Sequence, residues 1–127
     1  MDCRIGYVNL HVRDLERSLA FYRDTLGFAL MYHEPKFHYA AFDVGGMRFA
    51  IAETDKDPFT DTPVGNRMTG VGLVVQDLDE AYRELSAKGV EFPLEPGKQP
   101  WGGYMGIFSD PEGNLFYLDQ KSKEGAR

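Results

Sequence analysis

The segment YVNLHVRDL at residues 7–15 recurs in the second half of the chain as GVGLVVQDL at residues 70–78. In both copies apolar residues alternate with a mixed set, which is the pattern of a strand with one buried face. The alternating apolar residues are Val8, Leu10, Val12, Val71, Leu73 and Val75. An aspartate near the end of each copy precedes an apolar stripe with helical spacing, so the repeat predicts two successive strand and helix units.

The two predicted helices have recognisable start and stop signals. Asp14 suits the N-cap of the first helix, and Gly27 can end it in the left-handed conformation. In the second helix Asp77 and Glu80 have the spacing of a capping box, and Gly89 follows the last turn. The apolar stripes are Leu15, Leu19, Tyr22 and Leu26, then Leu78, Ala81, Tyr82 and Leu85.

Short segments of strand composition follow each helix. In the first half they are residues 29–34, 37–43 and 47–53, with Gly45-Gly46 as a hairpin turn. In the second half they are residues 104–108 and 115–119, on either side of the turn DPEG at residues 110–113. The chain is therefore predicted to be an α+β protein of two sequential βαβββ modules. We expect the modules to form one open, cup-shaped mixed sheet with the helices on its outer face.

The predicted organisation is a single domain over residues 1–127. Module one covers about residues 4–54, and module two covers about residues 69–121. Residues 55–68, rich in Asp, Pro and Thr, are expected to link the modules, and they could also cover the cup as a lid. The polar tail at residues 122–127 is expected to be disordered.

Composition argues against several classes of partner. No apolar run approaches the roughly 20 residues needed to cross a bilayer, and the start lacks a secretory signal, so we expect a cytoplasmic protein. The single Cys3 cannot form an internal disulfide. The formal charge of −6, with both signs interspersed, argues against binding to nucleic acid or to a membrane. An acidic surface would attract a cationic drug, but this net charge is common among cytoplasmic proteins and decides nothing by itself.

Four motifs carry a resemblance to a known superfamily. They are VRDLERSLAFY at residues 12–22, LGF at 26–28, PWGG at 100–103 and DPEGN at 110–114. Together they resemble the vicinal oxygen chelate superfamily, which includes glyoxalase I, extradiol dioxygenases, fosfomycin-resistance enzymes and bleomycin-resistance binding proteins. The resemblance covers nearly the whole chain and is closest in character to the metal-free bleomycin-resistance branch. It implies the cup-shaped fold and a homodimer, but not a particular reaction.

Metal-dependent members of that superfamily place His or Glu at four positions of the cup. The corresponding residues here are Tyr7, Ala50, Gly70 and Tyr117, so the resemblance implies neither a metal nor another cofactor. A shift of three residues in the last strand of module one would put Glu53 in place of Ala50. Such a shift would also reverse the faces of that strand.

The strand faces opposite the helices are expected to line the cup. They carry Tyr7, Asn9 and His11, then Gly72, Val74, Gln76, Tyr117 and Asp119, with Tyr104 added by the neighbouring strand. Trp101 resembles a tryptophan that borders the ligand cleft in the bleomycin-resistance branch. The predicted ligand-binding residues are Tyr7, Asn9, His11, Trp101, Tyr104 and Tyr117. Alternatively, Tyr7 and Tyr117 pack against each other and fill the cup.

The favoured functional hypothesis is a metal-free protein that sequesters a small aromatic or planar compound, such as an antibiotic. The alternative is an enzyme of the same fold, acting as a lyase, isomerase or dioxygenase. It would use His11 or a tyrosine as general acid or base, or a non-standard metal site. A third hypothesis is a structural or regulatory domain whose cup is filled by side chains. The sequence does not decide whether any reaction is catalysed.

Overall fold

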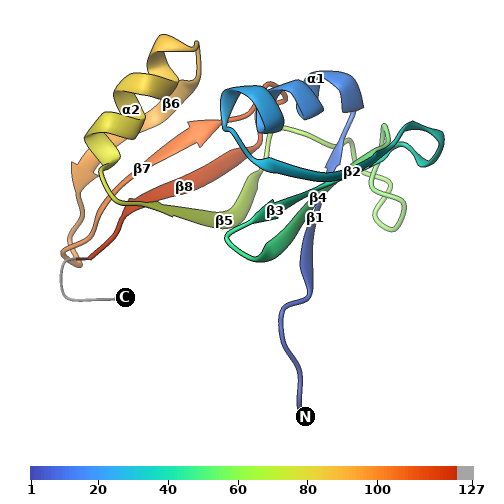
Figure 1. Ribbon diagram of the computed structural model, residues 1–127, viewed down its shortest axis with the longest axis horizontal. Helices are drawn as coiled ribbons and strands as arrows, with labels where there is room; N and C mark the ends of the chain where they lie inside the picture. Colours follow the sequence, from blue (N-terminus) through green and yellow to red (C-terminus); the bar gives the residue numbers. More distant parts are fainter. Residues whose placement is uncertain (123–127) are drawn as a thin grey trace. The chain divides into compact units, whose positions relative to one another are not determined.

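The computed structural model describes residues 1–122, which form two compact units (Figure 1). The first unit is Met1–Gly65, and the second begins at Asn66. The boundary between them falls within residues 55–68, the segment predicted as the linker. Apart from Ser122, the tail predicted to be disordered lies outside the described residues.

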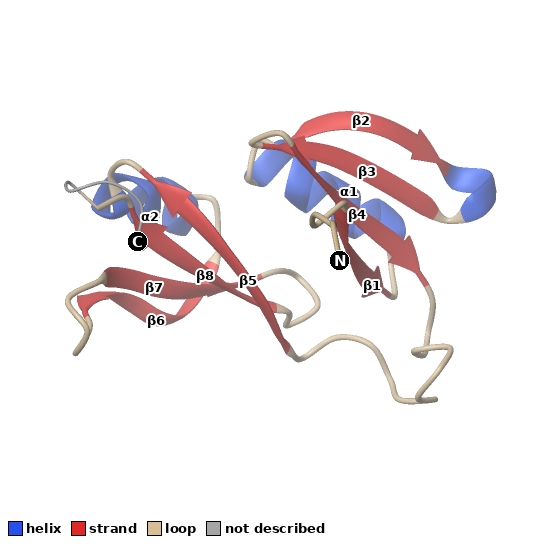
Figure 2. Ribbon diagram, turned by 90° about the horizontal axis from the view of Figure 1, so that it is seen from below, coloured by secondary structure: helices blue, strands red, loops and turns tan. Residues whose placement is uncertain are grey.

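The first unit is a βαβββ module. Its elements are β1 (Tyr7–Val12), α1 (Leu15–Ala20), β2 (Ala29–Glu34), β3 (Tyr39–Val44) and β4 (Met47–Glu53). The strands form one mixed sheet in the order β1-β4-β3-β2, in which β1 runs parallel to β4 and the other neighbours are antiparallel. Helix α1 covers one face of this sheet (Figure 2).

The second unit repeats the same arrangement. Its elements are β5 (Met68–Val75), α2 (Leu78–Ala87), β6 (Glu91–Lys98), β7 (Tyr104–Ser109) and β8 (Leu115–Gln120). The strand order is β5-β8-β7-β6, with β5 parallel to β8. The predicted α+β class and the two βαβββ modules are therefore confirmed. In the described part of the chain, no helix has the length and apolar character to span a membrane.

Strand β6 was not located from the sequence, although its module required a third strand after the helix. It contains Pro93 and Pro96, which lower the strand signal because proline cannot donate to a ladder. The strand lies at the edge of the sheet, where proline is tolerated, and its pairing with β7 is interrupted twice. The edge position explains how this sequence forms a strand.

The first helix is shorter than predicted and changes its winding before Gly27. Helix α1 ends at Ala20, and a π-helical turn continues over Phe21–Thr25. Phe21 and Tyr22, the first two residues of this turn, are both buried. Gly27 then has a φ of 77°, in the left-handed region predicted for the stop.

Each unit has an aromatic core between its helix and its sheet. In the first unit the Tyr22 ring centroid lies 5.1 Å from that of Phe49 and 6.1 Å from that of Phe42. In the second unit Phe108 stacks on Phe116 with the ring centroids 5.2 Å apart. These cores use the helix-facing side of each sheet, so the opposite faces are free of this packing role.

The segment between β4 and β5 folds back on itself instead of running as an extended linker. Lys56 and Pro63 form an isolated bridge, and the Asp57 carboxylate accepts hydrogen bonds from the backbone N–H groups of Phe59 and Thr60. Phe59 at the tip is 94% exposed. The proposed lid role of this loop stays a prediction.

Candidate functional site

The face of the first sheet opposite α1, here called the open face, carries a group of aromatic and charged side chains. Strand register places alternate residues on this face, so that Tyr7 on β1 pairs with Arg48 on β4, and Arg48 pairs with Asp43 on β3. The other open-face residues include Asn9, His11, Tyr32, Tyr39, Ala41, Ala50 and Ala52. Regular strands therefore position most of the site, which favours a rigid arrangement.

Arg48 lies at the centre of this group. Its guanidinium carbon is 4.6 Å from the centroid of the Tyr7 ring, a cation–π distance, and Nη1 is 3.5 Å from the hydroxyl oxygen of Tyr32. Tyr32 stacks on Tyr39 with the ring centroids 5.9 Å apart. Burial and the nearby Tyr32 raise the pKa of the Tyr39 hydroxyl, whereas the positive charge of Arg48 lowers it. The guanidinium is thus fixed by two tyrosines, one of which is supported by a third.

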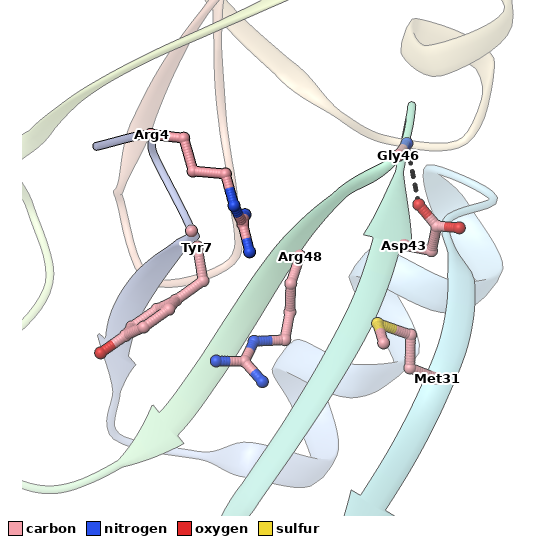
Figure 3. A pocket seen from close by; sticks show the side chains of 7 residues that line it. Arg4, Tyr7, Met31, Asp43, Gly46 and Arg48 are labelled. Atoms are coloured by element: carbon pink, nitrogen blue, oxygen red, sulfur yellow. Dashed lines mark hydrogen bonds between the residues drawn. The ribbon is translucent and has the colours of Figure 1, made fainter. Parts of the chain in front are cut away.

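A groove with a volume of about 530 Å³ opens beside Arg48 (Figure 3). Its lining residues are Arg4, Gly6, Tyr7, Met31, Asp43, Gly46 and Arg48. In Figure 3 the side chains of Arg4 and Tyr7 lie on one side, those of Met31 and Asp43 on the other, and Arg48 lies between them. This volume is within the range of about 300–1,000 Å³ that is usual for small-molecule sites.

Asp43 is engaged by the hairpin turn instead of by its cross-strand neighbour. Its Oδ1 accepts a hydrogen bond of 2.9 Å from the backbone N–H of Gly46. Both turn residues, Gly45 and Gly46, have positive φ angles of 59° and 89°, a conformation that favours glycine. No ion pair joins Arg48 to Asp43 or to any other carboxylate in residues 1–122.

The four positions at which the vicinal oxygen chelate superfamily places metal ligands do not supply a suitable set of donors. In the first unit they are Tyr7 and Ala50, and Ala50 is fully buried without a polar side-chain atom. In the second unit they are Gly70, which has no side chain, and Tyr117. No group of three or more His, Cys, Asp or Glu side chains in the described range could hold a metal ion. These residues do not fit a divalent metal at the superfamily's positions.

Glu53 has a structural role at the start of α1. The register of β4 places it on the helix side of the sheet, where Oε2 accepts a hydrogen bond of 2.8 Å from the backbone N–H of Leu15. Its Oε1 lies 3.0 Å from Nδ1 of His38. In the second unit Gln120 does the same, since its Oε1 accepts a hydrogen bond of 3.0 Å from the backbone N–H of Leu78. The register shift that would make Glu53 a metal ligand is therefore wrong.

Three predicted ligand-binding residues lie together on the open face of the first sheet. Tyr7 lines the groove and is 54% exposed. Asn9 is exposed opposite Ala50. His11 is half-buried and makes no hydrogen bond to Tyr7, to Asn9 or to any other residue of the described chain. The sequence therefore predicted their shared face, but not a hydrogen-bonding partner for the imidazole.

The second unit places its predicted ligand-binding residues differently. Tyr117 and Asp119 lie on the sheet face opposite α2, as expected, whereas Tyr104 lies on the helix side. Its hydroxyl donates a hydrogen bond of 2.6 Å to Oδ1 of Asp79 in α2, and this bond raises the pKa of Tyr104. The expectation that Tyr104 shares the face of Tyr117 is wrong, because the two residues have opposite parity in the antiparallel β7–β8 ladder. Trp101 is 67% exposed in the turn before β7.

Sequence reasoning missed Arg48, although the signal was present. The alternation that places Ala50 on the open face also places Arg48 there, one position earlier on the same face. Tyr32 and Tyr39 follow the same rule on their strands, except that an irregularity in β2 precedes Tyr32. Arg4 could not be found in this way, because it precedes the first strand and has no register.

Comparison with known proteins establishes the family. The sequence profile of the Glyoxalase/Bleomycin resistance protein/Dioxygenase superfamily matches residues 4–118 of the chain. The chain belongs to this superfamily. A crystal structure of a superfamily member from Sphaerobacter thermophilus superposes with a TM-score of 0.80 at 31% identity, covering 94% of this chain and 98% of that one. The fold inferred from sequence motifs is therefore that of the superfamily.

Similar members of the superfamily differ in their named activities. A bleomycin resistance protein from Geobacillus stearothermophilus is 28% identical over 126 residues, covering 90% of this chain and 94% of the relative. An antibiotic binding protein from Streptomyces, TnmS3, has a TM-score of 0.77 at 29% identity, with coverage of 95% and 98%. A lactoylglutathione lyase from Arabidopsis thaliana is 27% identical over 125 residues, covering 93% of this chain and 44% of the lyase. The superfamily thus includes both binding proteins and enzymes.

Proposed function

We propose that this protein binds a small aromatic or planar organic molecule and holds it without chemical change. The observation that carries the proposal is the groove of the first unit, where Tyr7 and Met31 expose large apolar surfaces beside the oriented guanidinium of Arg48. Such surfaces suit a flat ligand, because ring stacking supplies contact area and a few polar groups fix the orientation.

The residues at the metal-ligand positions agree with a binding role that uses no metal. Ala50 and Gly70 offer no side-chain donors, so the proposal assigns no step to a metal ion. The bleomycin resistance protein and the antibiotic binding protein among the similar chains support the same class of function. A bulky planar antibiotic is one compound of this kind.

The alternative function is catalysis with His11 as general acid or base, as an enzyme among the relatives would suggest. A general base usually acts together with a group that orients it. His11 has no hydrogen bond within residues 1–122, so the structure provides no such group. The third hypothesis, a face filled by side chains, fits poorly with a groove of about 530 Å³ in the first unit.

The proposal is tested by screening planar aromatic compounds by ligand-observed NMR, followed by mass spectrometry of the recovered ligand. We expect saturable binding with one site per chain and recovery of the compound unchanged. Tyr7→Ala should weaken binding at least tenfold, whereas the control substitution Tyr104→Phe, on the helix side of the second sheet, should not change it. Recovery of an altered compound would establish catalysis instead, and His11→Ala would then show whether the imidazole takes part.

The proposed assembly is a homodimer, an expectation that rests on the resemblance to the superfamily. Light scattering of the purified chain tests it directly, and a mass of one chain, about 14.4 kDa, would contradict it. The cytoplasmic location stays a prediction.

A further inference from the structure

We infer that the groove of the first unit selects a planar organic anion, and specifically an aromatic carboxylate whose charged end pairs with Arg48. This inference rests on the proposed binding function and adds the chemical class of the ligand. It also differs from what net charge alone would favour, since a chain with a formal charge of −6 would attract a cationic ligand.

Arg48 has unused hydrogen-bonding capacity that faces the groove. A guanidinium group has five N–H donors, and Arg48 makes one long contact of 3.5 Å, to the Tyr32 hydroxyl. Its Nε is buried and has no hydrogen-bonding partner among the described residues. This buried Nε lies out of reach of a ligand, whereas the terminal Nη1 and Nη2 of the same guanidinium keep N–H donors with which an acceptor in the groove can pair.

Arg48 also forms no ion pair with Asp43, the carboxylate beside it on the neighbouring strand. Asp43 is its direct cross-strand neighbour, and opposite charges at such positions commonly pair. Instead, the Asp43 carboxylate accepts the backbone N–H of Gly46 in the hairpin turn. Arg48 therefore has no ion pair among the described residues, and Arg4 adds a second positive charge to the same groove, so that with the carboxylate of Asp43 the lining residues carry a net charge of +1.

The guanidinium is positioned before any ligand arrives. Its Cζ lies over the Tyr7 ring, 4.6 Å from the ring centroid, and the Tyr32 hydroxyl contacts Nη1. Tyr32 is in turn stacked on Tyr39. A carboxylate can accept two parallel hydrogen bonds from such a fixed guanidinium fork, whereas a flexible ammonium group would lose more entropy on binding.

The remaining surface of the groove suits the aromatic part of the ligand. Tyr7 is 54% exposed and Met31 is 51% exposed, and both line the groove next to Arg48. A thioether and a phenol ring pack well against a flat π-system. An inorganic anion would leave these apolar surfaces in water, so the site favours an aromatic acid over phosphate or sulfate.

The test compares three probes of one shape: naphthalene-2-carboxylate, its neutral amide and the cationic 2-naphthylmethylammonium. Binding to the wild-type chain is measured by calorimetry or by NMR titration at low and at physiological salt. We expect the carboxylate to bind at least tenfold more tightly than the amide, and the cation to bind most weakly. The affinity of the carboxylate should fall as the salt concentration rises.

Substitutions then test whether the preference for the carboxylate probe depends on Arg48. Arg48→Met should abolish the advantage of the carboxylate while keeping most of the side-chain volume, and Arg48→Lys should restore only part of it. Arg83→Met removes an exposed arginine from α2 in the second unit and should change nothing. The NMR spectrum of each variant shows whether the fold is retained, and the comparison of probes on the wild-type chain needs no variant.

The outcomes separate this inference from the proposed function. Equal binding of the three probes, tighter binding of the cation, or an unchanged preference in Arg48→Met would overturn the inference and leave the binding function standing. Failure of all three probes, together with the wider aromatic panel, would overturn the proposed function and this inference with it.

Discussion

Replacing Glu53 by Ala should destabilise the first unit, because this side chain joins the last strand to the start of α1. Its Oε2 accepts the backbone N–H of Leu15 at 2.8 Å, and Leu15 is only 3% exposed. A hydrogen bond to a charged acceptor contributes about 1.5–3 kcal/mol, and an anion at a helix N-terminus adds a few tenths more. The Glu53 side chain is 32% exposed, so water can partly replace it, and we expect a loss of about 1.5–2.5 kcal/mol.

Glu53→Gln should cost less, about 0.5–1 kcal/mol, because an amide oxygen can accept the same bond. Gln120 already does so in the second unit, where it accepts the backbone N–H of Leu78 at 3.0 Å. Urea unfolding gives the change in free energy, and hydrogen exchange of the Leu15 amide reports the opening of this contact. Glu34→Ala, at an exposed position of β2, serves as the control and should stay within about 0.5 kcal/mol.

Two results would contradict this role of Glu53: a loss of unfolding free energy in Glu53→Ala no larger than in Glu34→Ala, or an unchanged exchange rate of the Leu15 amide. A Glu53→Gln variant as unstable as Glu53→Ala would mean that the charge matters more than the hydrogen bond. The contact of 3.0 Å between Oε1 of Glu53 and Nδ1 of His38 would then account for most of the stability that Glu53 provides.

Three further results follow from the second unit and the tyrosines. Gly106→Ala should lower the free energy of unfolding by at least about 1 kcal/mol, because the new Cβ would lie 2.9 Å from a backbone oxygen of β6. In the control Gly72→Ala the new Cβ meets only ordinary contacts at 3.6 Å, so urea unfolding should show little change. The contribution of Tyr39, Tyr82 and Tyr104 to stability should be constant up to about pH 10 and fall above it. Their pKa values are raised in the folded chain, so the unfolded chain releases these protons first. An unfolding midpoint that does not change between about pH 9 and high pH would contradict this. In an ultraviolet titration of phenolate, Tyr104→Phe should remove one late-titrating group, and loss of an early one would mean that the bond to Asp79 is absent in solution.

Local pattern was enough to predict the fold of each module. Alternation in residues 7–12 and 70–75 gives two strands, and aspartates followed by apolar stripes give two helices, because both periods arise from the geometry of the backbone itself. The position that corresponds to a superfamily ligand in the last strand, Ala50, lies on the face opposite the helix. Alternation along the same strand also places Arg48 on that face.

Contacts between distant segments could not be inferred in this way. Strand β6 depends on its edge position, Tyr104 depends on the β7–β8 register and on Asp79, and Glu53 depends on the helix terminus that it reaches. The partner of Asp43 could not be inferred either, because both the backbone N–H of Gly46 and the side chain of Arg48 are within its neighbourhood, and its carboxylate accepts the N–H. Sequence periodicity predicts which side of a helix or strand a residue faces. The identity of its partner is decided by packing between elements, and in this protein that packing leaves Arg48 without an ion pair among residues 1–122.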